Sequence, residues 1–216
     1  MKDKHMMYDA DYFERGIECG VSCYQNYRWL PELTTSLAMS YIDYLSLTRE
    51  HKILDYGASK GFIVKALRIL HRQAWGVDIS EYALNSADNS TREYLKLCTM
   101  NNFGNAIVPF DFNFDYILSK DVFEHLTEQD LSKILQVLYK KGKILFAVVP
   151  LGKNDKFIIP AYGLDKTHIL AKDKDWWIKE FRKNGWKLKE FSYYVSGIKE
   201  SWKNFEKGNG FFLLKK

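Results

Sequence analysis

Two carboxylates and two imidazoles form the most chemically suggestive group of side chains in this sequence. Asp121, Glu124 and His125 are spaced i, i+3 and i+4, so a helix would place all three on one face. His168 lies in a long polar segment, residues 151–172, which we expect to return over the same region. This donor set suits Mg²⁺, Mn²⁺ or Fe²⁺, and Zn²⁺ is also compatible with it. The spacing therefore predicts a divalent-cation site made of these four residues.

The same residues are also compatible with acid–base chemistry that uses no metal. An amine acceptor need only lose its proton, whereas an unactivated hydroxyl needs a base or a Lewis acid. In this alternative His125 is the leading general base and Glu124 lies beside it in the sequence. Tyr162 and Lys120 are weaker candidates for the base. The residue types alone leave both mechanisms open.

A glycine turn between a strand and a helix is the second feature that points to a ligand. Residues 52–56 have the apolar bias of a short buried strand, and apolar positions in residues 62–70 keep helical spacing. A turn of this kind directs the free N–H groups of a helix start toward a ligand, and its glycines let the backbone approach closely. Asp55 ends the strand, where ligands bind in open α/β sheets. The candidate binding residues here are Asp55, Gly57, Ala58, Ser59 and Gly61.

Three interpretations of this turn compete. The dinucleotide fingerprint G-x-G-x-x-G is not met, because Ser59 occupies the place of the second glycine. Gly57 to Gly61 do match G-x-S-x-G, which would make Ser59 the nucleophile of a hydrolase. The third interpretation is a nucleoside-binding loop. It is favoured because Asp78 ends the next predicted strand, 23 residues after Asp55, where a carboxylate can bind ribose hydroxyls. Ile79, which follows Asp78, is a further candidate cofactor-binding residue.

Five sequence blocks in order resemble the class I S-adenosylmethionine-dependent methyltransferases. The resemblance covers roughly residues 50–216, and it departs at Ser59, where many members carry glycine. The blocks are Asp55-x-Gly57-x-x-x-Gly61, Gly76-Val77-Asp78-Ile79-Ser80, Val108-Pro109-Phe110, Phe114-Asp115-Tyr116-Ile117 and Val122-Phe123-Glu124-His125-Leu126. The resemblance implies that S-adenosylmethionine is the cofactor.

The resemblance also extends the set of cofactor-binding residues. Asn101 or Asn102, in a polar loop, would hydrogen-bond the adenine edge. Ser119 and Lys120 stand at the ligand-facing end of the fourth predicted strand. Outside the region of resemblance, the aromatic loop of residues 24–29 could cover the site and offer Arg28 to a carboxylate. The pattern Asp121-x-x-Glu124-His125 with a distant histidine is similar to the metal site of ubiquinone-pathway O-methyltransferases and small-RNA 2′-O-methyltransferases, which carry glutamate at the first position. In the alternative, Glu-His-Leu merely begins a helix and binds no metal.

The order of the predicted elements specifies an α/β fold. Strands alternate with helices and two strands come last, which predicts a doubly wound, mostly parallel seven-stranded sheet with an antiparallel edge strand, as in the Rossmann-like methyltransferase fold. Residues 48–216 form the predicted catalytic domain and residues 1–47 a helical arm. The arm would either cover the site as a lid or simply pack on the sheet. Its aromatic residues are Tyr8, Tyr12, Phe13, Tyr24, Tyr27 and Trp29.

Composition and charge limit the function classes and the partners. The net charge is +5, divided into −6 over residues 1–130 and +11 over residues 131–216. The basic half could face an anionic small-molecule acceptor or, less well, RNA. Because its lysines are dispersed rather than clustered, a solvated lysine-rich surface is the favoured interpretation. The longest apolar run, residues 144–150, is too short to cross a bilayer, and the three cysteines show no metal-type pairing. We therefore expect a cytoplasmic protein without a membrane partner.

The favoured function is methyl transfer to a small metabolite or glycan precursor, at oxygen. One alternative is an RNA-modifying methyltransferase of the 2′-O type or an RNA-binding protein, motivated by the basic second half. A further alternative is the serine hydrolase that uses Ser59. Affinity for S-adenosylmethionine separates both methyltransferase interpretations from the hydrolase, and salt-dependent binding would identify an RNA ligand.

The ribose assignment predicts the effect of one substitution. Asp78→Ala removes a charged hydrogen-bond acceptor, a loss that typically costs about 1.5–3 kcal/mol, or roughly ten- to a hundredfold in affinity. We expect calorimetry to find cofactor affinity reduced by at least tenfold, with the fold retained by circular dichroism. Wild-type affinity in this variant would remove the ribose assignment.

Overall fold

The central element of the structure is a seven-stranded sheet. The structure is a computed structural model that describes residues 7–100 and 106–216. This sheet confirms the predicted α/β, doubly wound, mostly parallel fold. Its spatial order is β3, β2, β1, β6, β7, β11, β10. The bounds are β1 (Lys52–Tyr56), β2 (Gln73–Asp78), β3 (Leu95–Leu97), β6 (Phe114–Lys120), β7 (Gly142–Pro150), β10 (Lys187–Ser192) and β11 (Asn209–Lys215).

The direction of the strands brings several carboxyl ends to one edge of the sheet. β1 pairs in parallel with both β2 and β6, and β6 pairs in parallel with β7. β11 is antiparallel to β7 and to β10, so the reversed strand lies one position in from the edge. The order of the strands reverses at β1, whose neighbours are β2 and β6. Open α/β sheets bind ligands at such a reversal.

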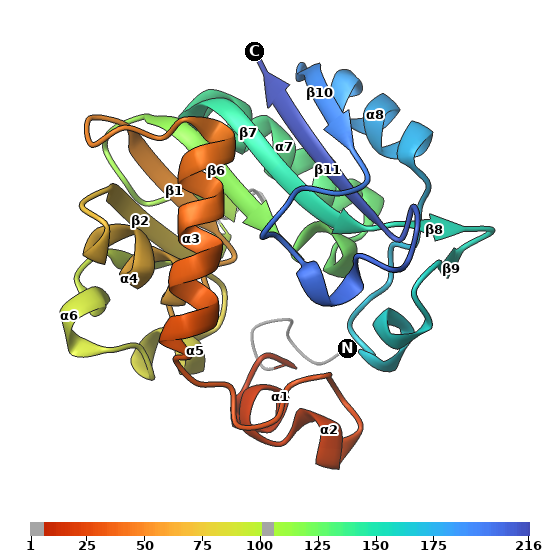
Figure 1. The fold of residues 1–216 in the computed structure, drawn as a ribbon, viewed down its shortest axis with the longest axis horizontal. Coiled ribbons are helices and arrows are strands. Elements are labelled where there is room, and N and C mark those ends of the chain that lie inside the picture. The colour runs from red at the N-terminus through yellow and green to blue at the C-terminus, as the bar shows by residue number, and fades with distance from the viewer. Residues whose placement is uncertain (1–6, 101–105) are drawn as a thin grey trace.

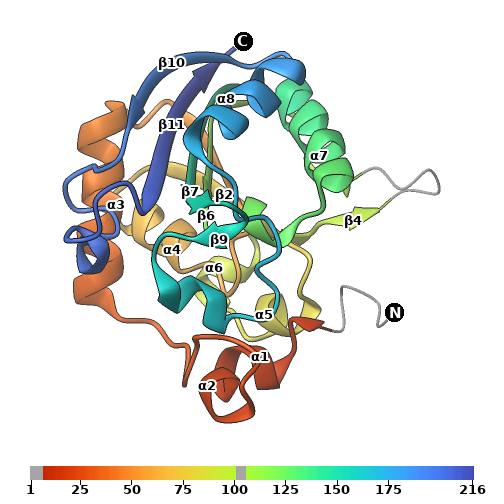
Figure 2. The same cartoon turned by 90° about the vertical axis from the view of Figure 1, so that its right-hand side faces the viewer.

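Helices cover both faces of the sheet (Figures 1 and 2). On one face α3 (Pro31–Leu45) and α4 (Phe62–Ile69) bury Ala38, Tyr41 and Leu67 in a shared hydrophobic core. On the other face α7 (Glu128–Lys141) and α8 (Lys174–Lys183) contribute to a second core. Most of β7 is buried between these layers, which explains its nearly continuous apolar sequence.

The remaining elements are short. Two small hairpins pair β4 (Thr99–Met100) with β5 (Ala106–Ile107) and β8 (Gly152–Lys153) with β9 (Lys156–Phe157). The short helices are α1 (Ala10–Glu14), α2 (Gly16–Cys19), α5 (Glu81–Asn85), α6 (Asn89–Arg92) and the 3₁₀ turns η2 (Phe123–His125), η3 (Pro160–Leu164) and η4 (Glu200–Trp202). Among the described residues, no helix has the length and apolar character needed to cross a bilayer.

The turn between β1 and α4 has the strained geometry that its glycines predicted. Gly57 and Gly61 have φ angles of 85° and 74°, and Ser59 between them has a φ of 52°. The N–H groups of Gly57 and Ala58 both donate to the Val77 carbonyl at 2.9 Å, which ties the turn to the end of β2. Non-glycine residues seldom occupy this backbone region. The turn therefore depends on glycine at its first and last positions.

A β-carbon at position 57 is predicted to distort this turn. The added atom would lie 2.3 Å from a Val122 methyl carbon, in a backbone conformation that L-residues disfavour by about 1 kcal/mol or more. We expect Gly57→Ala to lower both the melting temperature and the cofactor affinity. Gly163→Ala is the matched control, because a β-carbon there meets no atom within 4 Å. Equal behaviour of the two variants would show that the turn tolerates a side chain.

Candidate active site

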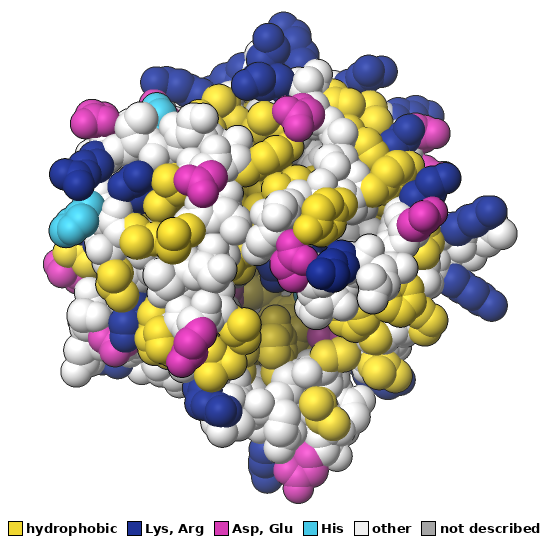
Figure 3. All heavy atoms as spheres, in the orientation of Figure 1, with side chains coloured by type: hydrophobic (Ala, Val, Ile, Leu, Met, Phe, Trp, Pro, Cys, Tyr) yellow, Lys and Arg dark blue, Asp and Glu magenta, His cyan; other side chains and the backbone are white. Residues whose placement is uncertain are grey.

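A cavity opens at the carboxyl ends of β1, β2 and β6. Figure 3 shows a hollow near the centre of one face of the molecule, with hydrophobic side chains on its floor. Six predicted site residues line the cavity: Gly57, Ser59, Asp78, Ile79, Asp121 and His125. The other lining residues outside the N-terminal arm were not predicted as site residues; they are Tyr56, Val77, Cys98, Val122, Leu126 and Ile134.

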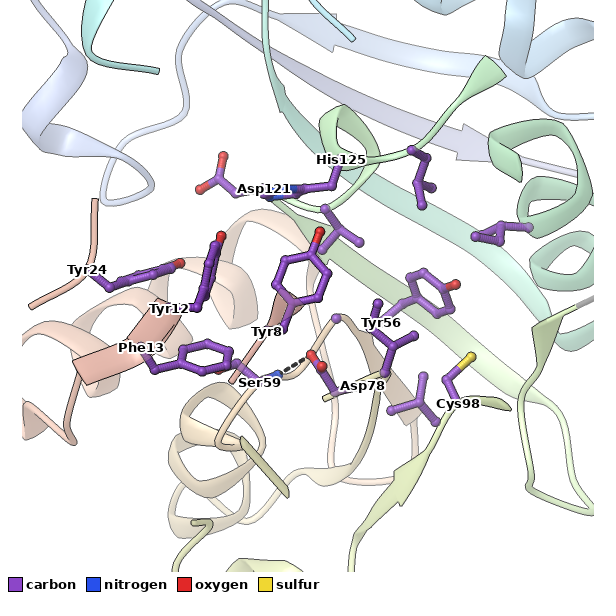
Figure 4. Close-up of a pocket in the computed structure, with 16 residues that line it drawn as sticks. Tyr8, Tyr12, Phe13, Tyr24, Tyr56, Ser59, Asp78, Cys98, Asp121 and His125 are labelled. Atoms are coloured by element: carbon purple, nitrogen blue, oxygen red, sulfur yellow. Dashed lines mark hydrogen bonds between the residues drawn. The ribbon is translucent and has the colours of Figure 1, made fainter. Parts of the chain in front are cut away.

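The Asp78 carboxylate is held by backbone N–H groups from both sides. Ser59 N donates to one oxygen at 2.7 Å and Ser80 N to the other at 2.8 Å. Burial raises the pKa of Asp78, and these N–H donors oppose that rise by stabilising the ionised form. Asp78 therefore faces the cavity in a fixed orientation (Figure 4).

Asp55 lies deeper, behind the cavity wall. Its side chain is buried, and its pKa is raised to about 7 by desolvation and by the neighbouring charge of Asp78, while Lys120 opposes the rise. A buried acid with this pKa changes charge near neutrality. A cationic ligand close to the turn would favour its ionised form.

Aromatic residues of the N-terminal arm form the opposite wall. Tyr8, Tyr12, Phe13 and Tyr24 all line the cavity. In Figure 4 Tyr8 stands between Ser59 and Asp78 on one side and His125 on the other. Ser80 anchors this wall, because its hydroxyl donates to the Tyr8 carbonyl at 2.6 Å.

Lys60, within the glycine turn, fastens the arm to the sheet. Its ammonium group pairs with the Glu14 carboxylate and donates to the Tyr27 carbonyl at 2.6 Å. Tyr82 donates to the same carboxylate at 2.9 Å. Because Lys60 is only 8% exposed, its charge depends on these partners. The arm and the turn are thus one hydrogen-bonded unit in this conformation.

The other predicted cofactor residues are distributed around this cavity or lie away from it. Ala58 is buried in the turn, and Ser119 has a buried hydroxyl at the end of β6. Arg28 is exposed and is not among the residues that line the cavity. Asn101 and Asn102 lie outside the described residues.

The expectation that Asp121, Glu124 and His125 share a helix face is wrong. Asp121 has a φ of 56°, and only a short 3₁₀ turn, η2, follows it. Its carboxylate is bound by Lys120 at 2.6 Å and by Lys199, and although burial opposes them these lysines lower its pKa. Asp121 is therefore already neutralised by two cations, which a helix pattern in the sequence could not reveal.

Glu124, His125 and His168 do come together. One possible ligand atom from each residue can be chosen so that all three lie within 4.8 Å of one another. His168 Nε2 is 3.9 Å from a Glu124 oxygen, and the two imidazole rings are 4.5 Å apart. Neither oxygen of the fully buried Glu124 has a hydrogen-bond partner among the described residues. A buried carboxylate without a partner is costly unless a cation or a proton joins it.

Protonation states differ sharply within this cluster. Burial and the neighbouring Asp121 raise the pKa of Glu124 well above its usual range. Burial and the adjacent His168 lower the pKa of His125 to about 4, so the ring is neutral at physiological pH. A neutral imidazole is the form that binds a metal ion, whereas a base with this pKa captures protons weakly.

The serine-hydrolase alternative lacks the partners that it requires. Within residues 7–100 and 106–216, the buried Ser59 hydroxyl makes no hydrogen bond to a histidine or a carboxylate. A nucleophilic serine needs an adjacent base to remove its proton. Ser59 instead contributes its backbone N–H to Asp78.

Four further residues of the site escaped the sequence analysis. Lys60 and Lys199 pair with the carboxylates of Glu14 and Asp121, and Asp165 and Thr167 bind Tyr12 and His125, respectively. The run Asp165-Lys166-Thr167-His168 was the available signal, since it places two more polar residues beside the predicted ligand His168.

The pKa of Asp55 predicts how cofactor binding depends on pH. Below about pH 7 the free protein holds a proton on Asp55, and a cationic cofactor favours its release, so affinity should increase as pH rises through 7. We expect calorimetry to show roughly a tenfold gain between about pH 6 and pH 8. Asp55→Asn should abolish most of this dependence. The cofactor-free wild type should also lose stability relative to that variant as pH rises from about 4 to 7, because the folded state binds the extra proton.

Part of the sequence matches a known protein family. Residues 54–146 match the family model described as "Methyltransferase domain". This region contains the glycine turn, Asp78 and the Glu124-His125 pair. No curated protein matches the sequence at a significant level.

Solved structures share the fold at low sequence identity. A chain in the complex of the Haloferax volcanii Trm112 methyltransferase activator with a methyltransferase is 15% identical, with a TM-score of 0.66 over 100% of this chain and 98% of that chain. A SAM-dependent methyltransferase from Archaeoglobus fulgidus is 13% identical, with a TM-score of 0.63 over 86% and 97%. Magnesium protoporphyrin IX methyltransferase from Synechocystis PCC 6803, solved with bound SAH, is 14% identical, with a TM-score of 0.59 over 86% and 82%. The methyltransferase-domain match over residues 54–146 and the strand order together support an S-adenosylmethionine-dependent methyltransferase that resembles the class I enzymes.

Proposed function

We propose that this enzyme methylates an oxygen of a small-molecule acceptor and that Glu124, His125 and His168 hold a divalent cation beside that acceptor. The observation that carries the proposal is the Glu124 carboxylate, buried without a hydrogen-bond partner among the described residues and facing two imidazoles. A bound cation would supply the missing partner. It would also oppose the rise in the pKa of Glu124 that burial causes.

The histidines favour binding a cation over removing a proton. His125 Nδ1 contacts the Thr167 hydroxyl at 2.7 Å, and His168 Nδ1 contacts the Tyr162 carbonyl at 2.7 Å. Metal-binding histidines commonly use one ring nitrogen for such a contact and the other for the ion. The low pKa of His125 makes it a weak base for an alcohol.

Two histidines and one carboxylate suit Mn²⁺, Fe²⁺ or Zn²⁺, and Mg²⁺ is compatible through the carboxylate and water. When bound, such an ion lowers the pKa of a coordinated hydroxyl and can orient a second oxygen. The proposed acceptor therefore carries two neighbouring oxygens, as in a vicinal diol. Bound S-adenosylmethionine would supply the sulfonium methyl to the acceptor oxygen, with the electron pair of the broken sulfur–carbon bond going to sulfur and the hydroxyl proton to solvent.

The cofactor would occupy the cavity between the glycine turn and the arm. We assign the ribose hydroxyls to Asp78 and the methionine portion to the turn from Gly57 to Gly61, supported by the fixed carboxylate and the close backbone approach. Ser119 and Lys120 would lie near the methionine portion, and Asn101 or Asn102 would serve the adenine. Arg28 would need a movement of the exposed segment that carries it to reach the carboxylate.

The arm, residues 1–47, would act as the lid of this site. The ion pair between Lys60 and Glu14 supports this role because it joins the lid directly to the cofactor turn. Tyr8, Tyr12 and Tyr24 would then exclude water from the methyl group. Excluding water strengthens the electrostatic interactions inside a site.

RNA methylation at the 2′ oxygen is the second candidate. The observation in its favour is the net charge of +11 over residues 131–216, since RNA also offers neighbouring oxygens on a ribose. Dispersed lysines, however, give no continuous phosphate-binding stripe. A small anionic acceptor remains the better match.

Chelation is predicted to abolish methyl transfer. We would screen metabolite and RNA pools with labelled S-adenosylmethionine, treat the active reaction exhaustively with chelator, and add back Mn²⁺, Fe²⁺, Zn²⁺ or Mg²⁺. Turnover should fall at least about a hundredfold and return with one of these ions. Glu124→Gln and His168→Ala should lose metal measured by elemental analysis.

His71→Asn is the control, because His71 is exposed, lies outside the cluster and has a φ of 57° that asparagine tolerates. Turnover that survives chelation, together with a silent His168→Ala variant, would eliminate the cation. His125 would then have to serve as the base despite its low pKa.

A further inference from the structure

A chain of hydrogen bonds connects the N-terminal arm to His125. The Tyr12 hydroxyl donates to one Asp165 oxygen at 2.8 Å, and the Thr167 hydroxyl donates to the other at 2.6 Å. The Thr167 oxygen then meets His125 Nδ1 at 2.7 Å. Tyr12, Asp165 and Thr167 are 4%, 4% and 7% exposed, so water does not compete for these contacts.

The chemistry of each group determines the positions of the protons. A carboxylate only accepts, so Tyr12 and Thr167 must both donate to Asp165. The single proton of Thr167 is thereby used, and its oxygen can only accept from the imidazole. His125 Nδ1 must therefore carry the hydrogen, and Nε2 is left with a free lone pair.

The backbone keeps the geometry of this chain fixed. Thr167 N also donates to Asp165, at 2.8 Å, which closes a tight turn around the carboxylate. Ile169 N and Leu170 N both donate to the Glu124 carbonyl, at 2.9 and 3.0 Å. The loop that carries Asp165 and Thr167 is thus bonded to the residue immediately before His125.

Tyr12 has a distinct task at the far end of the chain. The Asp165 oxygen that accepts from Tyr12 lies 3.9 Å from His168 Nε2. Without the Tyr12 hydroxyl, that oxygen would be free to turn toward the second imidazole. The seated arm therefore keeps the carboxylate directed at Thr167.

We propose that Asp165, Thr167 and Tyr12 are positioning residues that hold His125 in the tautomer with hydrogen on Nδ1 and present Nε2 to the reaction. This inference deepens the proposed function, since it concerns the same histidine. It holds whether Nε2 binds a cation or accepts a proton, because both roles require the free lone pair. The proposal also implies that the reactivity of His125 depends on the contact between the N-terminal arm and Asp165, which Tyr12 makes.

Nitrogen NMR of histidine-labelled, metal-free protein tests the tautomer directly. His125→Gln identifies the His125 signals among those of the five histidines. The wild type should show a protonated Nδ1 and an unprotonated Nε2. Thr167→Val keeps the shape but removes the acceptor, so its His125 should shift toward a mixture of tautomers. Thr167→Ser keeps the hydroxyl and should retain the wild-type signals.

Kinetics supply the second readout. In Thr167→Val we expect kcat to fall about ten- to a hundredfold, as for other residues that orient a reactive histidine, with the cofactor Kd within about twofold of wild type. Thr167→Ser should restore most of kcat. Tyr12→Phe should lower kcat and broaden or shift the His125 signals, which a purely structural role of the ring would not cause.

Hydrogen on Nε2 in the wild type would overturn the proposal, even if Thr167→Val failed to fold. An unchanged tautomer and kcat in a folded Thr167→Val variant would do the same. Loss of the cation hypothesis by chelation would leave the tautomer measurement untouched, because that measurement is made without metal. The two proposals therefore fail by separate observations.

Discussion

The gathering of carboxyl groups at the carboxyl edge of the sheet is the constraint on which the rest of the site depends. Asp55, Asp78, Asp121 and Glu124 all end up at or near the ends of three adjacent strands. Removing a carboxylate from water is costly unless a donor, a cation or a proton compensates it. The protein uses each of these solutions once or more. Their distribution supports the proposed division of the site into a cofactor side and an acceptor side.

On the cofactor side the compensation comes mostly from the backbone. The Asp78 carboxyl group accepts hydrogen bonds from fixed N–H groups of the glycine turn and of Ser80, which caps α5. This arrangement is rigid, so the carboxylate needs little reorganisation when a ribose arrives. Asp55 has a pKa raised to about 7, so a cationic ligand near it would change its charge close to neutrality.

On the acceptor side the compensation is unequal. Asp121 is paired with Lys120 and Lys199, whereas Glu124 receives no donor among the described residues and lies beside two imidazoles. This difference supports the proposal that Glu124, rather than Asp121, binds a ligand. The arm then connects both sides, because Lys60 holds it at the turn while Tyr12 reaches the loop that orients His125.

The sequence by itself determined the local features of this protein. Alternating strands and helices, the glycine turn and Asp78 at the end of β2 are encoded by neighbouring residues, since apolar periodicity and glycine conformation act over a few positions. The approach of His168 to the Glu124-His125 pair was also predictable as a candidate, because a long loop needs a reason for its length.

Only the tertiary structure decided which side chains share each contact. Asp121 was predicted to be a ligand, but a left-handed backbone and Lys199, 78 residues away, give it other partners. The pairing of Thr167 with His125 spans 42 residues, and that of Tyr12 with Asp165 spans 153. Such contacts depend on where loops return over the sheet, and loop paths follow from packing against the whole molecule rather than from any local pattern. For that reason the chemical roles of individual residues could be predicted from the sequence, but their hydrogen-bond partners could not.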